Sequence, residues 1–250
     1  MPSYQTEAKR ILKGFQAKAS RYENQEILLL ANKWQVVSNH LGELITKLSA
    51  EEILSADKLF KLDLYKQFLQ VSQQQVNQFN AYALKTVTSG QEAFAAYGLG
   101  IAQDSLGLIT VNFNRINIAA VNNMIGFASD GSPLYTLFAR SYPESVAKLT
   151  NTLITSTTMG YNPAKTARLL AANMDGNLSR ALTIARTEQM NVLRETSIEQ
   201  MQQSGVCRGW IRIEQPDACD DCLGENGKHY GFEESFDSHP NCRGAAIPDV

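Results

Sequence analysis

Three cysteines and a histidine near the C-terminus have the spacing of a metal site. Cys219 and Cys222 are separated by two residues, and after sixteen more residues His239 and Cys242 form a second close pair. Each pair can occupy two corners of a tetrahedron while the loop between them forms a hairpin, as in four-ligand structural zinc sites. A catalytic zinc keeps one position open for water, so this complete set of ligands predicts a structural Zn²⁺.

Other uses of these residues stay open. The cysteines would form disulfides in an oxidising compartment, but nothing in the sequence indicates export. A zinc deaminase needs an upstream His-x-Glu, whereas Leu41 and Gly42 follow His40. A metal-dependent nuclease or hydrolase acting on DNA would need an open metal position, with His229 or Asp221 taking part. Cys207 and His229 are also reserve candidates for a metal ligand.

Apolar periodicity predicts the helices that must carry this site. Seven apolar residues alternate in three- and four-residue steps, which is typical of one helix face: Ile27, Leu30, Trp34, Val37, Leu41, Leu44 and Leu48. A second run has one polar member: Leu62, Tyr65, Leu69, Ser72, Val76, Phe79 and Ala83. Ser49 and Glu52 predict a capping box before that second helix. Two such helices favour an antiparallel pair, or a face shared with another subunit.

The middle of the chain has weaker signals. Glycines at Gly90, Gly98, Gly100 and Gly107 predict that the helix breaks there. The other predicted elements are an extended piece at 109–113, a helix from 115 to about 127 capped by Asn114, a turn at 130–133, a helix at 143–159 ended by Gly160, a helix from 163 to about 174 capped by Asn162, and a last helix from Asn177 ended by Gly205.

After Gly205 the pattern changes from helices to strands and turns. Residues 210–213 alternate like a strand, glycines mark turns, and residues 245–247 favour another short strand. A segment of this size buries little apolar surface, so it normally needs a metal or disulfide to hold it together. The predicted fold is mainly α with a small C-terminal zinc-stapled β module, an α+β chain.

Charge is distributed unevenly along the chain. The formal net charge is -2, from 23 basic and 25 acidic residues. Residues 205–250 hold four basic and nine acidic side chains, giving -5, so the remainder sums to +3. This balance argues against a protein that coats nucleic acid. One modest basic stretch supplies candidate DNA contacts: Lys9, Arg10, Lys13, Lys18 and Arg21.

Long apolar runs are missing from the sequence. No run reaches the roughly 18 residues needed to cross a bilayer, and the N-terminus lacks the apolar core of a secretory signal. We therefore expect a protein made in the cytoplasm that has no membrane partner.

A series of short motifs follows in order along the C-terminal half. They are Gly160-Tyr161-Asn162-Pro163, Ala167-Arg168, Ala185-Arg186-Thr187-Glu188, Gly205, Trp210, Cys219-x-x-Cys222, Gly227-Lys228 and His239-Pro240-Asn241-Cys242-Arg243. This order resembles the phage Mu F-like minor head protein family, the phage head morphogenesis proteins, over residues 109–250. The resemblance divides the chain into an N-terminal helical region at 1–108, the helical part of the minor-head-protein core at 109–204, and the zinc-binding β module at 205–250.

The resemblance implies a non-enzymatic virion protein. Its expected place is inside the phage head at the portal vertex, with a role in head morphogenesis and in the handling or ejection of packaged DNA. The expected partner is the portal protein, and the major capsid protein, a scaffolding protein and packaged DNA are further candidates. Arg186, Glu188 and Trp210 belong to the structural signature, and we expect Arg186 and Glu188 to tie the long helix to neighbouring segments or to the zinc module. A DNA-binding head protein is an alternative.

Overall fold

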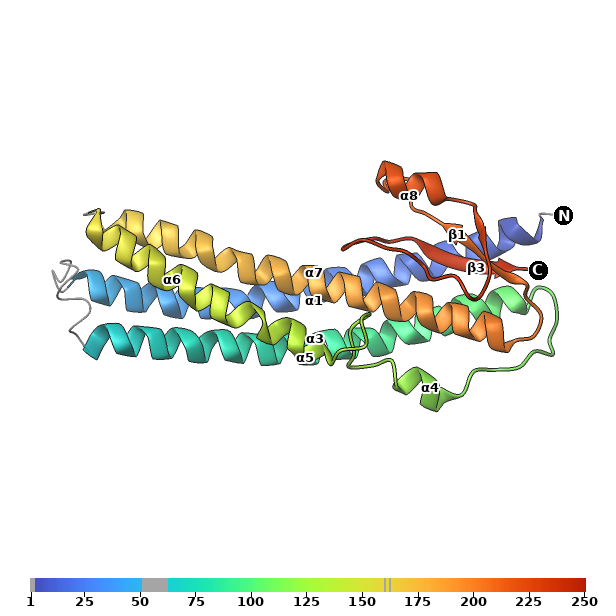
Figure 1. The fold of residues 1–250 in the computed structure, drawn as a ribbon, viewed down its shortest axis with the longest axis horizontal. Helices are drawn as coiled ribbons and strands as arrows, with labels where there is room; N and C mark the ends of the chain where they lie inside the picture. The colour runs from blue at the N-terminus through green and yellow to red at the C-terminus, as the bar shows by residue number, and fades with distance from the viewer. Residues whose placement is uncertain (1–2, 51–62, 160, 162) are drawn as a thin grey trace. The chain divides into compact units, whose positions relative to one another are not determined.

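The fold is mainly helical, with a small antiparallel sheet at the C-terminus (Figure 1), which confirms the predicted combination of a helical body and a β module. The computed structural model describes residues 3–50, 63–159, 161 and 163–250. The helices are α1 (Tyr4–Ala50), α3 (Asp63–Leu106), α4 (Ile118–Asn122), α5 (Leu134–Ala139), α6 (Ser141–Thr158), α7 (Pro163–Gln203) and α8 (Asp220–Glu225). Among the described helices, none has an apolar stretch long enough to span a bilayer.

The chain forms two compact units, each assembled from segments that are distant in the sequence. The first unit comprises Met1–Glu26, Val87–Pro133 and Thr183–Val250. The second unit comprises Ile27–Thr86 and Leu134–Leu182. The sequence-based division into contiguous segments at 1–108, 109–204 and 205–250 stays a prediction.

In the second unit, α1 and α3 run antiparallel, as their apolar periodicity predicts (Figure 1). The buried members of the two stripes are Leu30, Trp34, Val37 and Leu41 on α1, and Ser72, Val76, Phe79 and Ala83 on α3. The Trp34 and Phe79 rings meet edge to face, with their centroids 4.8 Å apart. Ser49 lies within α1, so it does not cap a second helix, while Glu52, Leu62, Gly160 and Asn162 lie outside the described residues.

The core of the first unit joins three long helices to the sheet. It contains Ala8, Leu12 and Ala19 of α1, Phe94 and Ile101 of α3, Met190 and Leu193 of α7, and Ile211, Ala245 and Ile247 of the strands. Alternate strand residues point to the same face of a sheet, which places Ala245 and Ile247 together against the helices. Residues at the two ends of the chain therefore share one apolar core.

The predicted helix break is wrong at Gly90, Gly98 and Gly100, because α3 continues through them, but the helix does end at Leu106, just before Gly107. A β-carbon on Gly98 would overlap the backbone carbonyl of Leu193 on α7. A β-carbon on Gly100 would overlap the ring of Phe15 on α1. Tertiary packing thus outweighs the low helix propensity of glycine here, since only glycine permits so close an approach of the neighbouring helices.

We expect Gly98→Ala to destabilise the protein by about 1–3 kcal/mol, because a methyl group would have to displace the α7 backbone. Gly14→Ala is the matched control, since Gly14 is a helical glycine whose β-carbon would meet nothing within 4 Å. There the same change should stabilise by about 0.5–1 kcal/mol through helix propensity alone. Urea unfolding of both variants measures the difference, and equal effects at the two positions would contradict this packing.

Two other predicted helix boundaries are also wrong. The helix expected from 115 to 127 is the five-residue α4, and Asn117 rather than Asn114 caps it by accepting the Ala119 N–H at 2.9 Å. The two helices expected at 163–174 and from Asn177 are the single helix α7. Asn177 is buried within that helix, so it does not act as a cap.

Candidate metal centre

The candidate metal ligands lie in the segments that connect the strands of the small sheet. Its central strand β1 (Gly209–Ile213) pairs antiparallel with β2 (His229–Tyr230) on one side and with β3 (Ala245–Asp249) on the other. The strands predicted at 210–213 and 245–247 are thereby confirmed. Cys219 immediately precedes α8 and Cys222 lies in its first turn, whereas the second pair of candidate ligands lies in the loop that leads into β3.

The sequence His239-Pro240-Asn241-Cys242 folds as a tight turn. The Cys242 N–H donates to the His239 carbonyl at 3.1 Å, which closes a four-residue turn. Asn241 has a φ of 66°, and a proline followed by a residue with positive φ is the pattern of a type II turn. Asparagine tolerates this conformation better than most residues, so the turn is encoded locally and holds His239 close to Cys242.

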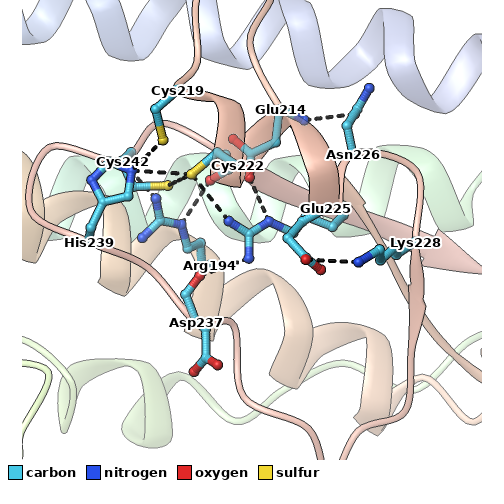
Figure 2. Close-up of polar contacts among 12 residues, drawn as sticks. Arg194, Glu214, Cys219, Cys222, Glu225, Asn226, Lys228, Asp237, His239 and Cys242 are labelled. Carbon is cyan, nitrogen blue, oxygen red and sulfur yellow. Dashed lines mark hydrogen bonds and ion pairs between the residues drawn. The ribbon is translucent and has the colours of Figure 1, made fainter.

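The four side chains converge as Figure 2 shows. His239 Nε2 lies 3.3 Å from Cys219 Sγ and 3.2 Å from Cys222 Sγ, and the Cys222 and Cys242 sulfur atoms are 3.8 Å apart. Zinc bonds of about 2.3 Å to sulfur and about 2.0 Å to nitrogen give ligand separations of roughly 3.5–3.8 Å in a tetrahedron. The His239 contacts to Cys219 and Cys222, and the contact between Cys222 and Cys242, are thus already close to the separations of ligands on one metal ion, so the cluster could hold one.

Two overlapping groups of ligands are present among the described residues. One is Cys219, Cys222 and His239, and the other is Glu214, Cys222 and Cys242. Within each group the ligand atoms all lie within 4.8 Å of one another. Cys222 belongs to both groups and is thus the central ligand of the site.

Hydrogen bonding prepares His239 to bind through one particular nitrogen. Its Nδ1 lies 2.9 Å from the Pro240 carbonyl, which can only accept, so Nδ1 carries the proton. Nε2 then presents its lone pair to Cys219 and Cys222, as in metal-bound histidines. The bond to Pro240 also raises the pKa of His239.

The two cysteines of the first pair lie in different environments. Burial raises the pKa of Cys222 to about 12, whereas the backbone N–H of Cys222 donates to the exposed Cys219 thiol and lowers its pKa. Because metals bind the thiolate, metal binding must displace the Cys222 proton.

Two buried arginines surround the cysteines. Arg212 Nη2 donates to Cys222 Sγ at 3.5 Å, and Arg194 Nη2 donates to the Cys242 carbonyl at 2.6 Å. With a divalent metal, three thiolates leave a charge of -1, the two arginines add +2, and the buried carboxylate of Glu214 adds -1. The loaded centre is therefore neutral, which removes much of the cost of burying its charges.

Trp210 lies at the centre of an aromatic stack beside the metal cluster. Its ring stacks on Tyr230 at 4.4 Å and on Phe236 at 5.3 Å, measured between centroids. The Arg194 and Arg212 guanidinium carbons lie 4.7 and 4.3 Å from the centre of the Phe236 ring. Trp210 is completely buried, and its Nε1–H donates to a backbone carbonyl. The stack therefore holds in place the arginines that contact the cysteine residues.

Arg186 connects α7 to the turn between the second pair of ligands. Its side chain bonds to Glu23 of α1 and donates from Nη1 to Asn241 Oδ1 at 3.1 Å. Arg243 Nη2 donates to both carboxylate oxygens of Glu23, at 2.9 and 3.0 Å, and the Asn241 N–H donates to Thr187 Oγ1 at 3.1 Å. Arg186 thus ties the long helix to α1 through the acidic side chain of Glu23 and to the turn at 239–242 through Asn241.

Glu188 bonds to a different segment from Arg186. It is 7% exposed, and its Oε2 accepts the backbone N–H of Ser129 at 2.8 Å. Burial raises its pKa. Glu188 thus ties α7 to the loop at 126–133, so the two charged residues of the motif bind on separate sides of the helix, as their spacing requires.

The other candidate residues lie apart from the cysteine cluster. His229 Nδ1 is 2.9 Å from Asp249 Oδ2 on the sheet, and Cys207 accepts a weak bond from Ser204. Neither His229 nor Cys207 joins the two groups of metal ligands found among the described residues. The five basic candidates for DNA contact are all exposed on α1.

Sequence reasoning missed four residues that surround the site: Glu23, Arg194, Arg212 and Glu214. Of these four residues, only those at or next to strand β1 could have been recognised from the sequence. Trp210 and Arg212 are spaced by two and share one face of this strand, and Glu214 follows at the same spacing just past its end, so charges occur where apolar residues would be expected. Glu23 and Arg194 act through partners distant in the sequence, and one chain alone offers no sign of such contacts.

Glu26 is a buried acid one turn beyond Glu23. It is 3% exposed, and Gln189 Nε2 donates to its two oxygens at 2.7 and 2.8 Å. Burial raises its pKa to about 7. The Gln189 Oε1 has no hydrogen-bond partner among the described residues. A neutral, protonated Glu26 is thus better suited to this position than a carboxylate.

We expect Glu26→Gln to flatten the pH dependence of stability. The folded chain holds the Glu26 proton up to pH 7, whereas the unfolded chain releases it near pH 4.5, so this group's contribution to stability is full below pH 4.5 and is lost as the pH rises to 7. Glutamine avoids that loss, which is about 1–3 kcal/mol. Urea unfolding at pH 5 and pH 8 should show the gain only at pH 8. The exposed Glu92→Gln serves as the control, and an equal gain at both pH values would contradict the argument.

Comparisons with known proteins find no relative of this chain. No protein-family model matches it, and neither does any curated protein or solved structure. Any statement on its function must therefore rest on its own motifs and contacts.

Proposed function

We propose that this protein is a bacteriophage minor head protein, similar to the phage Mu F-like family, which binds the portal protein and acts in head morphogenesis and in the handling or ejection of packaged DNA. One observation carries the proposal. The motif segment at 185–188 contacts the turn at 239–242 through Arg186 and Thr187, which both bond to Asn241. A motif order is a stronger resemblance when its members also form one network of contacts.

In this proposal the metal is zinc and its role is structural. Three thiolates and one imidazole are the ligands of many structural zinc sites. Two of the cysteines, Cys222 and Cys242, are buried, and both receive support from arginines at the same site. Zinc would supply folding free energy to a sheet too small to hold itself together, and it would take no part in a reaction.

Association with a portal ring tests the head-protein proposal. The protein would be expressed together with the portal protein of the same phage genome, and the assembled rings would be purified and imaged. We expect the protein to co-purify with the rings and to add density to them. Asn241→Ala, which removes the side-chain contact to Arg186, should weaken co-purification more than Asn32→Ala at an exposed position of α1. If the wild-type protein is absent from both the portal rings and the assembled heads, the proposal is contradicted.

A metal-dependent nuclease or hydrolase is the second candidate, favoured by a cavity next to the ligands. This cavity has a volume of about 450 Å³, and Asp221, Cys222, Asp237 and His239 contribute to its lining. Such an enzyme requires a metal with an open coordination position. Asp221→Asn should then abolish cleavage of double-stranded DNA while the zinc content stays unchanged. A wild-type protein that cleaves no DNA with its metal bound would exclude this function.

DNA binding through α1 is the third candidate, favoured by the exposure of Lys9, Arg10, Lys13, Lys18 and Arg21 on one helix. Glu7 pairs with Arg10 at 2.7 Å, which leaves four cations without that neutralisation. The logarithm of the binding constant for duplex DNA should fall with the logarithm of the salt concentration at a slope of about -4, since each phosphate contact contributes roughly -0.9. Exchanging the five residues for glutamine should abolish the slope. Affinity that is insensitive to salt would exclude this surface as the binding site.

A further inference from the structure

Glu214 is a buried carboxylate with one oxygen unpaired. Its side chain is 1% exposed. Oε1 accepts the Arg212 Nε–H at 2.6 Å, but Oε2 has no hydrogen-bond partner among the described residues. Buried carboxylate oxygens are normally satisfied by donors or by a metal ion, so the lone Oε2 needs an explanation.

The carboxylate lies against the two buried cysteines of the metal cluster (Figure 2). A Glu214 oxygen, Cys222 Sγ and Cys242 Sγ lie within 4.8 Å of one another. A β-carbon on Gly244 would overlap this carboxylate, so glycine at that position leaves the space that Glu214 occupies. The local backbone is thus shaped to accommodate an acid beside the cysteines.

Among the three candidate cysteine ligands, Cys219 is the one exposed to solvent. Cys219 and His239 are exposed, whereas Cys222 and Cys242 are each 4% exposed. An exposed thiolate is the ligand that solvent and reactive small molecules reach first. Any loss of a thiolate ligand should therefore begin at Cys219.

We propose that Glu214 is a reserve metal ligand, whose carboxylate binds the ion together with Cys222, Cys242 and His239 when Cys219 is no longer a ligand. The inference rests on the proposed zinc centre. Carboxylate oxygen is a normal zinc ligand at about 2.0–2.2 Å. Both ligand sets carry three negative charges, so the ion keeps the same total ligand charge after the exchange. The metal would shift inward, toward the buried group of Glu214, Cys222 and Cys242.

A double-mutant cycle on zinc affinity tests this role. Zinc affinity would be measured by competition with a chromophoric chelator for wild type, Cys219→Ala, Glu214→Gln and the double variant. We expect Glu214→Gln alone to weaken zinc binding by about tenfold, because it removes one charge from the neutral centre, and Cys219→Ala to keep one zinc at reduced affinity. The double variant should bind at least about 100-fold more weakly than Cys219→Ala, because it lacks both the exposed ligand and its replacement. If the loss of zinc affinity in the double variant only equals the product of the losses in the two single variants, the proposal is overturned.

A second measurement identifies the ligand atom directly. X-ray absorption of zinc-loaded Cys219→Ala should show a shell of two sulfur atoms together with nitrogen and oxygen, and the oxygen contribution should change when Glu214→Gln is added. Cys219→Ser provides an independent background if the alanine variant folds poorly. Cys222→Ala should lose tight binding with or without Glu214, as it removes the ligand common to both groups.

The outcomes separate the two levels of the proposal. A wild-type protein without zinc would exclude the metal centre itself. A wild-type protein that binds zinc, with a Cys219→Ala variant as weak as Cys222→Ala, would exclude the reserve ligand alone.

Discussion

Replacing Cys222 with serine is expected to abolish tight zinc binding and to unfold residues 205–250. Cys222 is common to both groups of metal ligands, and it accepts the hydrogen bond from Arg212. Metal-binding free energies on the order of 10 kcal/mol drive the folding of comparably small zinc modules. Without the ion, the cysteines would be protonated and neutral, so the positive charges of the two buried arginines would no longer be balanced by thiolates. Hydrogen exchange should show loss of protection in β1 and β3, and a chelator should produce the same result in wild type.

Cys207→Ser is the matched control for this experiment. Cys207 is a cysteine of the same segment that belongs to neither ligand group, so its loss should leave zinc content and exchange protection unchanged. Protection in the second unit should also survive in Cys222→Ser, because the core of that unit contains none of the ligands. An intact sheet in zinc-free Cys222→Ser would contradict the structural role of the metal.

Trp210→Ala is expected to cost about 3–5 kcal/mol of stability and to weaken zinc binding as well. The substitution removes a completely buried ring from between Tyr230 and Phe236. Phe236 in turn lies against the two arginines that bond to the cysteines, so a collapsed stack would displace them. Trp210→Phe should restore most of the affinity. Chelator competition and urea unfolding measure the two effects.

Trp34→Ala separates loss of stability from loss of zinc affinity. Trp34 is also buried, but it packs on Phe79 in the second unit. We expect a similar loss of stability from this variant with unchanged zinc affinity. Equal zinc affinities in Trp210→Ala and Trp34→Ala would show that the aromatic stack does not support the metal centre.

The parts of the fold that could be predicted are those encoded by short-range spacing. The alternation from Ile27 to Leu41 and from Ser72 to Ala83 follows from helix geometry alone, and it predicted the paired apolar faces. The two close pairs of cysteine and histidine ligands are equally local, because α8 and the turn at 239–242 each bring their own two residues together. Patterns of this kind need no knowledge of the rest of the chain.

The parts that could not be predicted depend on contacts between distant segments. Gly98 has a low helix propensity, and only the approach of Leu193 explains why a glycine lies in the middle of α3. Glu23 resembles a solvated helix residue until Arg186 and Arg243 bond to it from more than 160 positions away. The prediction at Gly98 was therefore wrong, and the role of Glu23 was missed, because at both positions tertiary packing outweighs the local preference of the residue.

Zinc stoichiometry is the most direct test of a metal-stapled module. The full chain would be purified under reducing conditions without added chelator, and its metal content would be measured by elemental mass spectrometry together with native mass spectrometry of the intact protein. We predict one zinc ion per chain, retained after extensive dialysis and released when the sheet unfolds. A chain free of metal whose C-terminal sheet remains fully protected in hydrogen exchange would contradict this account.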